Sequence, residues 1–170
     1  MPLVAHGFDD LMGRKLFSLR LATAAELPPR VDLQSPHFAC LLAWDASHAT
    51  TESVSALVER LLRSGASYFV CWGPGSERVE DTIDELVADP ANDFGIPDES
   101  VIMTTSHASE PLEEALWFLL RSSWPEEHYV DSTRAALAIS IGSLAWAQEI
   151  SAAFDDVQGF VQRVSTDGVA

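Results

Sequence analysis

Polar side chains that could do chemistry follow several apolar runs of this chain. Asp45 and His48 come after the run 38–44, and His107 follows a later apolar run. A histidine oriented by a carboxylate is the smallest general-base unit, and two histidines with an aspartate also suit a divalent cation. We expect the three side chains to converge only if their strands are neighbours. The competing interpretation is that both histidines are solvated and that Asp45 caps a turn.

Cys71 ends another apolar run, directly before a glycine turn. A thiol there would be a nucleophile if a histidine lowered its pKa. The surrounding sequence, Val-Cys-Trp-Gly-Pro-Gly, lacks the Gly-x-Ser-x-Gly pattern of a nucleophile elbow. A free cysteine usually behaves as a small hydrophobe, which is the competing interpretation for Cys71 and for Cys40. Two cysteines without a Cys-x-x-Cys pair do not make a zinc site.

The turn that follows Cys71 opens a predicted helix and presents backbone N–H groups of the kind that hold phosphates. It matches neither known glycine-rich phosphate motif, and acidic residues early in the helix would repel a phosphate, so a nucleotide sensor is only a third hypothesis. Trp44 and Trp72 end neighbouring predicted strands and would form either an aromatic lip for a planar ligand or ordinary layer packing. The candidate ligand-binding residues of this rim are Trp44, Trp72, Gly73, Gly75, Ser76 and Ser106.

An alternation of apolar strands and amphipathic helices positions these residues. Continuous apolar runs predict strands that are covered on both faces, and apolar residues spaced i, i+3, i+4 and i+7 predict helices packed against them. The predicted strands are 38–44, 67–72, 100–104 and 135–141, and the predicted helices are 51–64, 76–88, 111–122 and one that starts after Ser143 and continues past Phe154.

This element order predicts an α/β protein, a three-layer α/β/α sandwich around a mostly parallel four-stranded sheet. The strand orders 2-1-3-4 and 3-2-1-4 both fit. Residues 1–36 are interpreted as an N-terminal lead-in that packs on a single α/β domain, 37–170, and Lys15–Ala22 is a candidate antiparallel edge strand. The pattern resembles small Rossmann-like or flavodoxin-like domains, an architecture that implies no function. Ligands of such sheets bind at the carboxyl ends of the strands.

The charge of the chain restricts its partners. It has 170 residues, with 26 Asp and Glu against 10 Lys and Arg, which gives a formal net charge of −16. This excludes generic nucleic-acid binding through a basic surface and argues against docking on anionic membranes. No apolar stretch approaches the ~20 residues of a membrane helix, and no secretory apolar region precedes the domain, so we expect a cytoplasmic protein. The densest acidic segments, 76–88 and 89–99, are the expected face for a basic partner, although solubility alone also explains the charge.

The predicted helix 111–122 has more apolar residues than one stripe needs. Trp117 and Phe118 on this helix, and Trp124 just after it, predict either cover by the lead-in or an interface with another chain. The leading hypothesis is therefore a non-enzymatic module that docks a basic protein partner or self-associates. The alternative is a small-ligand-binding protein or a hydrolase-type enzyme that uses Asp45, His48, Cys71 and His107. The sequence identifies no cofactor and does not decide between enzyme and binding module.

Overall fold

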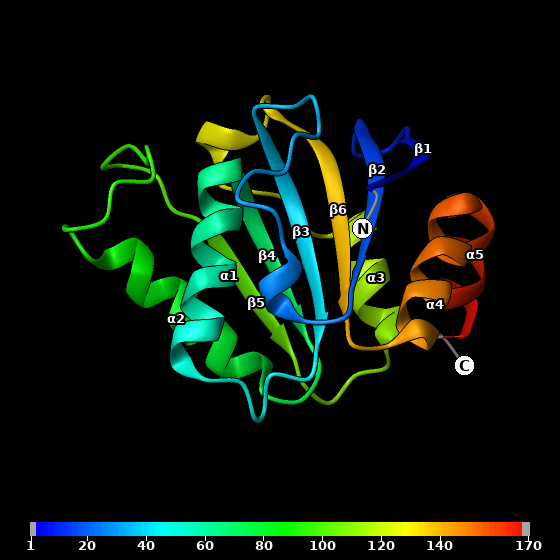
Figure 1. Ribbon diagram of the computed structural model, residues 1–170. Helices are drawn as coiled ribbons and strands as arrows, with labels where there is room; N and C mark the ends of the chain where they lie inside the picture. The colour runs from blue at the N-terminus through cyan, green and yellow to red at the C-terminus, as the bar shows by residue number, and fades with distance from the viewer. Residues whose placement is uncertain (1–2, 168–170) are drawn as a thin grey trace.

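A six-stranded sheet runs through the centre of the computed structural model, which describes residues 3–167 (Figure 1). The strands are β1 (Val4–Asp9), β2 (Arg14–Leu21), β3 (His37–Trp44), β4 (Ala66–Trp72), β5 (Met103–His107) and β6 (Thr133–Ile141). Their spatial order is β1-β2-β6-β3-β4-β5. Only β1 is antiparallel to its neighbour, and the other five strands are parallel.

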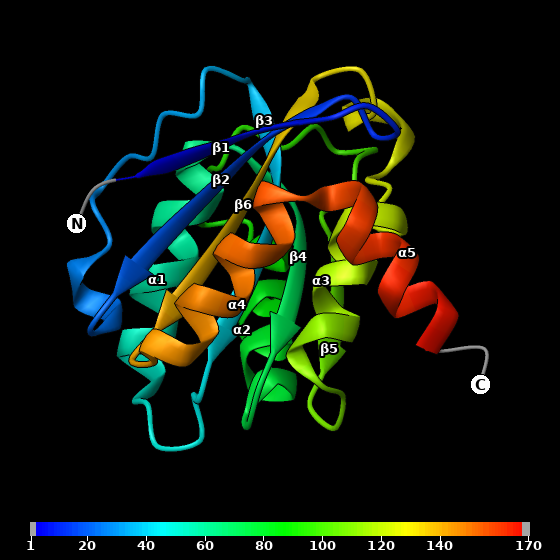
Figure 2. The same ribbon diagram turned by 90° about the vertical axis from the view of Figure 1, so that its right-hand side faces the viewer.

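Helices cover both faces of the sheet (Figure 2). The elements on one face are η1 (Ala24–Glu26), α1 (Thr51–Ser64) and α2 (Ser76–Ala88), and those on the other are α3 (Leu112–Arg121), α4 (Leu144–Asp155) and α5 (Val157–Asp167). A short η2 (Glu127–Tyr129) precedes β6. The side chain of Thr50 accepts a hydrogen bond from the N–H of Ser53 to begin α1, and Gly65, at φ 110°, ends it. The local sequence therefore determines this helix to the residue.

The predicted α/β class and the mostly parallel sheet are confirmed, but the sheet has six strands rather than four. The strands predicted from the alternation adopt the order 3-2-1-4, one of the two that fitted. The prediction of an antiparallel edge at Lys15–Ala22 is wrong, because β2 is an internal strand parallel to β6. The antiparallel edge is β1, a strand with mostly exposed residues that carries no apolar run to reveal it.

Two predicted element boundaries are also corrected. β5 pairs with β4 from Met103 to His107, three residues later than the predicted strand 100–104, because the apolar residues Val101 and Ile102 precede the strand, whose own residues are mostly polar. The last predicted helix divides at Asp156, whose backbone has φ −145° and ψ 75°. The side chain of Asp156 accepts from the N–H of Gly159, so it caps a new helix, α5.

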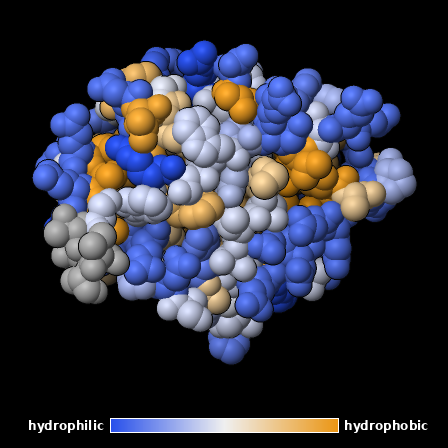
Figure 3. Space-filling view, turned by 180° about the vertical axis from the view of Figure 1, so that it is seen from behind, coloured by the Kyte–Doolittle hydropathy of each residue, from blue (hydrophilic) through white to orange (hydrophobic). Residues whose placement is uncertain are grey.

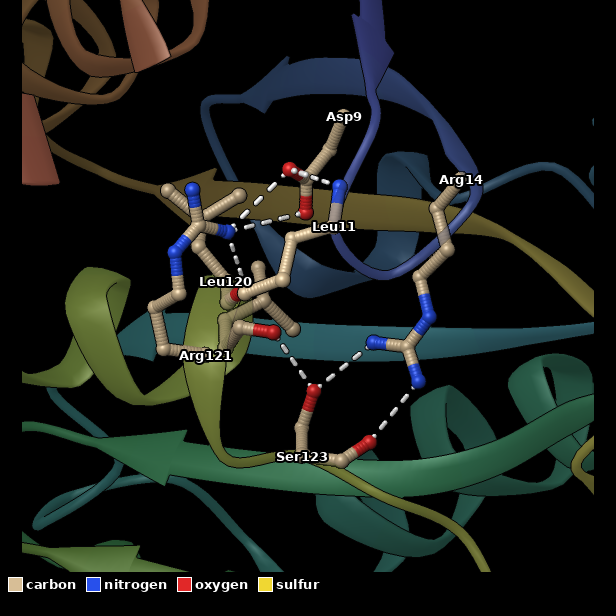
Figure 4. A network of polar contacts seen from close by, with 7 residues as sticks. Asp9, Leu11, Arg14, Leu120, Arg121 and Ser123 are labelled. Carbon is tan, nitrogen blue, oxygen red and sulfur yellow. Dashed lines mark hydrogen bonds and ion pairs between the residues drawn. The ribbon is translucent and has the colours of Figure 1, made fainter. Parts of the chain in front are cut away.

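A buried polar network attaches the β1–β2 hairpin to the end of α3 (Figure 4). Arg121 Nη1 lies 3.1 Å from both carboxylate oxygens of Asp9. Arg14 donates to Ser123 Oγ at 2.8 Å and to the Ser123 carbonyl oxygen at 2.9 Å. Burial lowers the pKa of Arg14 to about 10, an effect that the charge of Asp9 opposes, so Arg14 stays protonated at neutral pH. The network fixes the hairpin as part of the sheet.

Candidate functional site

His107, at the end of β5, is the central residue of a hydrogen-bonded chain. Its Nδ1 lies 2.9 Å from Glu110 Oε2, and its Nε2 lies 3.0 Å from Thr105 Oγ1. Because a carboxylate only accepts, Nδ1 donates to Glu110, and in the neutral imidazole Nε2 then accepts from the threonine hydroxyl. Tyr68 also hydrogen-bonds Thr105, which completes the chain on its inner side. The sequence predicts His107 and Thr105 at the rim of the sheet but not the carboxylate partner, Glu110.

The order of these groups limits their chemistry. The side chain of His107 is only 7% exposed, whereas that of Glu110 is 41% exposed, so the carboxylate is the outermost group. A nucleophilic triad requires the opposite order, with the hydroxyl turned toward the substrate and the carboxylate behind the histidine. The outermost group of this hydrogen-bonded chain is therefore the carboxylate of Glu110, which presents a negative charge, and not a nucleophile, to a ligand.

A cavity of about 570 Å³ lies beside this chain, and we call it the His107 pocket. Its lining residues are His107, Glu110, Glu114, Trp117, Phe118, Val164 and Ser165. The ring of Phe118 lies 4.9 Å from that of His107, and Trp117 Nε1 donates to Ser165 Oγ at 3.0 Å. The pocket thus has aromatic walls, two carboxylates and no Lys or Arg among its lining residues. On the same side of the molecule, apolar groups form several small patches separated by polar ones (Figure 3).

The apolar surface predicted on the helix 111–122 packs on the sheet and against both α4 and α5. Trp117 and Phe118 are half-buried and line the His107 pocket, whereas the polar contacts of the lead-in with this region, through Asp9 and Arg14, lie at the C-terminal end of α3. Trp124 lies apart from them and is 50% exposed. The structure therefore joins two predicted interface residues with one predicted catalytic residue in a single pocket.

Acidic groups also lie on the opposite face of β5, against α2. Thr104 Oγ1 donates to Asp84 Oδ1 at 3.3 Å, and Ser106 hydrogen-bonds Glu80. Burial raises the pKa of Glu80, and the charges of Asp84 and other acids of α2 raise it further. No Lys or Arg occurs between Arg78 and Arg121, a segment whose eleven acidic residues are Glu80, Asp81, Asp84, Glu85, Asp89, Asp93, Asp98, Glu99, Glu110, Glu113 and Glu114.

Asp45 and His48 do not join this site. β4 separates β3 from β5, so the loop after β3 is not adjacent to His107 in the sheet. Asp45 is exposed and accepts from both the N–H and the hydroxyl of Ser47, and these hydrogen bonds lower its pKa. His48 is exposed as well. The pair has the geometry of a solvated turn.

The thiols of Cys40 and Cys71 are buried and free. Burial raises the pKa of both thiols well above the ordinary range, and the acidic side chains of Glu80 and Asp84 add to the effect at Cys71. Both cysteines are therefore protonated at neutral pH and pack as small apolar residues, on the face of the sheet that α1 and α2 cover.

The glycine turn after β4 packs against the loop after β3. A Cβ added at Gly73 would meet the Trp44 carbonyl oxygen, and one at Gly75 would meet the backbone of Ala46 and Ser47. The N–H of Ala46 donates to the Pro74 carbonyl oxygen at 2.9 Å. The glycines thus permit a close contact between two loops. Ser76 Oγ is buried without a hydrogen-bond partner within residues 3–167.

The two rim tryptophans lie on opposite faces of the sheet. Trp44 is buried in the core under α1, whereas Trp72 contacts the ring of Trp146 on the α4 side, at 5.0 Å. Trp72 Nε1 also donates to the Glu110 carbonyl oxygen at 2.8 Å, which helps to fix the loop that carries Glu110. They therefore do not form one aromatic lip.

A second histidine, which the sequence analysis missed, is held in the same way near β1. His6 Nδ1 lies 2.7 Å from Asp155 Oδ1, and His6 Nε2 lies 2.7 Å from Ser18 Oγ. The carboxylate is again outermost, because the side chain of His6 is 4% exposed and that of Asp155 is 65% exposed. These residues are too far apart in the sequence for any spacing to reveal them. In contrast, His107 and Glu110 are only three residues apart, a local spacing from which their pairing could have been predicted.

Two further properties bear on the classes of function. Among residues 3–167, no group of three or more His, Cys, Asp or Glu side chains is arranged to hold a metal ion. In that part of the chain, no helix has both the length and the apolar character that crossing a bilayer requires.

Comparison with known proteins identifies a family but no function. No curated protein and no solved structure shows significant similarity to this chain. One family model, described as a domain of unknown function, DUF7684, matches residues 16–157, which include β5 and all of α2 and α3 but not β1. Since the match spans well over half of the 170 residues, the chain belongs to the DUF7684 family.

Proposed function

We propose that this domain binds a positively charged segment of a protein partner at the His107 pocket. The observation that supports the proposal is an apolar hollow bordered by Glu110 and Glu114, with no cationic side chain among its lining residues. The faces of Trp117 and Phe118 suit the long apolar stem of an arginine or lysine, and the carboxylates suit its charged end. A basic side chain would thus satisfy both components of the pocket.

The charge of the whole molecule supports the same kind of partner. A net charge of −16 attracts a basic protein and increases its association rate, an effect that salt screens. Exposed ion pairs contribute only about 0–1 kcal/mol each, so the affinity depends on the apolar contacts of the pocket as well. We expect the binding to be salt-sensitive and to be localised by the aromatic walls.

Self-association is a second form of the proposal, and a different surface supports it. Trp124 is 50% exposed, and Val130, six residues later, is 42% exposed. Light scattering at several protein concentrations tests this form, and a mass that stays at 18.5 kDa at the highest concentration would reject it. The hydrolase alternative has less support, because the hydroxyl of Thr105 is the inner group of its hydrogen-bonded chain.

Calorimetric titration with a short peptide of alternating arginine and lysine tests the binding proposal. The variant Glu110→Gln/Glu114→Gln removes two charges, while the amide oxygen at position 110 still accepts from His107. We expect it to weaken binding about tenfold, since two ion pairs contribute up to about 1 kcal/mol each.

The matched control is Glu52→Gln/Glu127→Gln, which removes the same charge from exposed positions elsewhere. It should weaken binding less than about threefold, through the long-range field alone. If the two variants lose affinity equally, the peptide is attracted by total charge and the pocket has no specific role.

A further inference from the structure

We propose that the basic segment binds in an extended conformation along the free edge of β5 and becomes a further strand of the sheet. This inference rests on the proposed function and names its mode of binding and its partner class. The partner is a protein segment with basic residues at successive positions. Addition of a strand to an exposed sheet edge is an established mode of peptide recognition, in which the main chain supplies hydrogen bonds and the side chains supply specificity.

The edge at β5 lacks the features that usually block such pairing. Natural sheets protect their edges with lysine, proline, bulges or inward charges. Within Met103–His107 there is no Lys, Pro or acidic residue, and the register with β4 runs without a shift. Three of its five residues are half-buried, and Met103 is 38% exposed. The described chain, residues 3–167, places no strand on the outer side of β5.

Acidic side chains lie on both sides of this edge. Side chains alternate between the two faces of a strand, so Thr105 and His107 face α3, whereas Thr104 and Ser106 face α2. On the α3 side the nearby carboxylates are Glu110 and Glu114 of the His107 pocket, and on the α2 side they are Glu80 and Asp84.

An added strand alternates in the same way. Two successive basic residues would therefore place one side chain near the His107 pocket and the other near α2. A single anchoring residue in the pocket would leave the acids of α2 unused, whereas an extended basic segment pairs with both groups. The charge pattern thus matches a strand more fully than it matches one inserted side chain.

The same charges exclude a second copy of this chain as the occupant of the edge. Pairing β5 with β5 would bring two copies of the acidic segment together, and like charges opposite each other destabilise a ladder. Burial is the main cause of the raised pKa of Glu80, and the charges of neighbouring carboxylates on α2, Asp84 first among them, raise it further, so more carboxylates at this edge would add to the repulsion. The edge is thus closed to its own copies and open to a basic partner.

Hydrogen exchange of the β5 amides, measured with and without the arginine–lysine peptide, tests the inference. The matched control is the same peptide with alternate backbone nitrogens methylated on the edge that would pair, which keeps every charge and removes the main-chain donors. We expect the unmethylated peptide to slow exchange of the outward amides of β5 at least tenfold, and the methylated peptide to bind at least tenfold more weakly.

A variant on the α2 side provides an independent test, because the residues there do not line the pocket. The variant Glu80→Gln/Asp84→Asn should weaken binding of the peptide about as much as the variant Glu110→Gln/Glu114→Gln does. If the peptide binds in the pocket but leaves β5 exchange and the α2 variant unaffected, the strand inference is overturned and the proposed function stands. If neither the unmethylated nor the methylated peptide binds the wild-type protein, the strand inference and the proposed function are both overturned.

Discussion

The two edge strands of the sheet, β1 and β5, differ in the regularity of their pairing and in what lies on their outer side. At β1 the pairing with β2 shifts between Ala5 and Gly7, which leaves His6 as the extra residue of a bulge. The bulge places His6 between Ser18 and Asp155, to which it is hydrogen-bonded. At β5 the ladder is regular and its outer side has no partner in residues 3–167. One edge is irregular and fixed to its own subunit, and the other is regular and open.

The two edges also differ in charge, which is compensated at β1 and uncompensated at β5. Asp9, at the end of β1, is buried against Arg121, and the two charges compensate each other. Around β5 the carboxylates of two helices lie in a segment that contains no Lys or Arg. The comparison shows that β1 is satisfied within the protein, whereas β5 retains both hydrogen-bonding groups and negative charge for a partner.

The largest expected effect comes from breaking the ion pair between Asp9 of β1 and Arg121 of α3. Asp9→Ala leaves Arg121 without its carboxylate and should destabilise the protein by about 3 kcal/mol, the lower end of the range for breaking a buried pair, because Arg121 is 16% exposed. Denaturant unfolding measures this loss. Binding of the arginine–lysine peptide to the folded variant should be unchanged, and a parallel loss of binding would contradict the separation of the two edges.

The bulge at β1 gives the next largest effect. Gly7 has φ 144°, and a Cβ added there would meet nothing within 4 Å, so only backbone strain opposes a side chain. Gly7→Ala should therefore cost about 1–2 kcal/mol. The matched substitution Gly95→Ala, also at positive φ and in open space, controls for strain in a loop. An unchanged unfolding midpoint for Gly7→Ala would mean that the bulge is not maintained by this residue.

At β5 the hydrogen-bonded chain of His107 has a smaller expected contribution. Thr105→Val removes the hydroxyl that is hydrogen-bonded to His107 and Tyr68 and should cost about 1 kcal/mol, because the group is only half-buried and water can replace part of the lost bonding. Peptide affinity should change less than about twofold, because the carboxylate of Glu110 is retained. If the variant instead abolished a hydrolytic activity of the wild type, Thr105 would be a catalytic residue and the binding proposal would be wrong.

The smallest expected effect concerns repulsion on the α2 side. The pKa of Glu80 in the folded protein is raised above its ordinary value of 4.5, so its charge destabilises the fold at pH values above the raised pKa. Glu80→Gln should increase stability at pH 7 by about 0.2–0.5 kcal/mol, the effect of one like-charge pair on a helix. The gain should disappear as the pH falls well below 4.5, to about 3, where Glu80 is protonated in both the folded and the unfolded state. A gain that persisted at about pH 3 would indicate a cause other than charge.

The sequence predicts the elements with apolar surfaces and misses those without them. α1 and α2 were predicted to the residue because amphipathic spacing is a local signal, and α1 is also capped by Thr50 and Gly65. β1 was missed because its residues are mostly exposed and form no apolar run, and β5 was misplaced because an apolar run precedes its polar strand residues. The pairing of strands is decided by packing over the whole chain, so the sequence left two orders open.

The candidate site was predictable only in part, for the same physical reason. His107, Trp117 and Phe118 were nominated separately, and only tertiary packing of α3 and α5 brings them into one pocket. Glu110 follows His107 by three residues and was within reach of sequence analysis. The acids of α2 were predicted as a face for a basic partner, but their position beside β5 depends on strand order.

Amide chemical shifts of labelled protein, followed during titration with the arginine–lysine peptide, test the central claim most directly. An acidic cavity of about 590 Å³ beside β1, lined in part by Asp10, Asp155 and Asp156, is the internal competitor. We predict that the largest shift changes occur in β5 and in the segments that carry Glu80 and Glu110. Changes concentrated around Asp155, or spread evenly over acidic surfaces, would contradict the account.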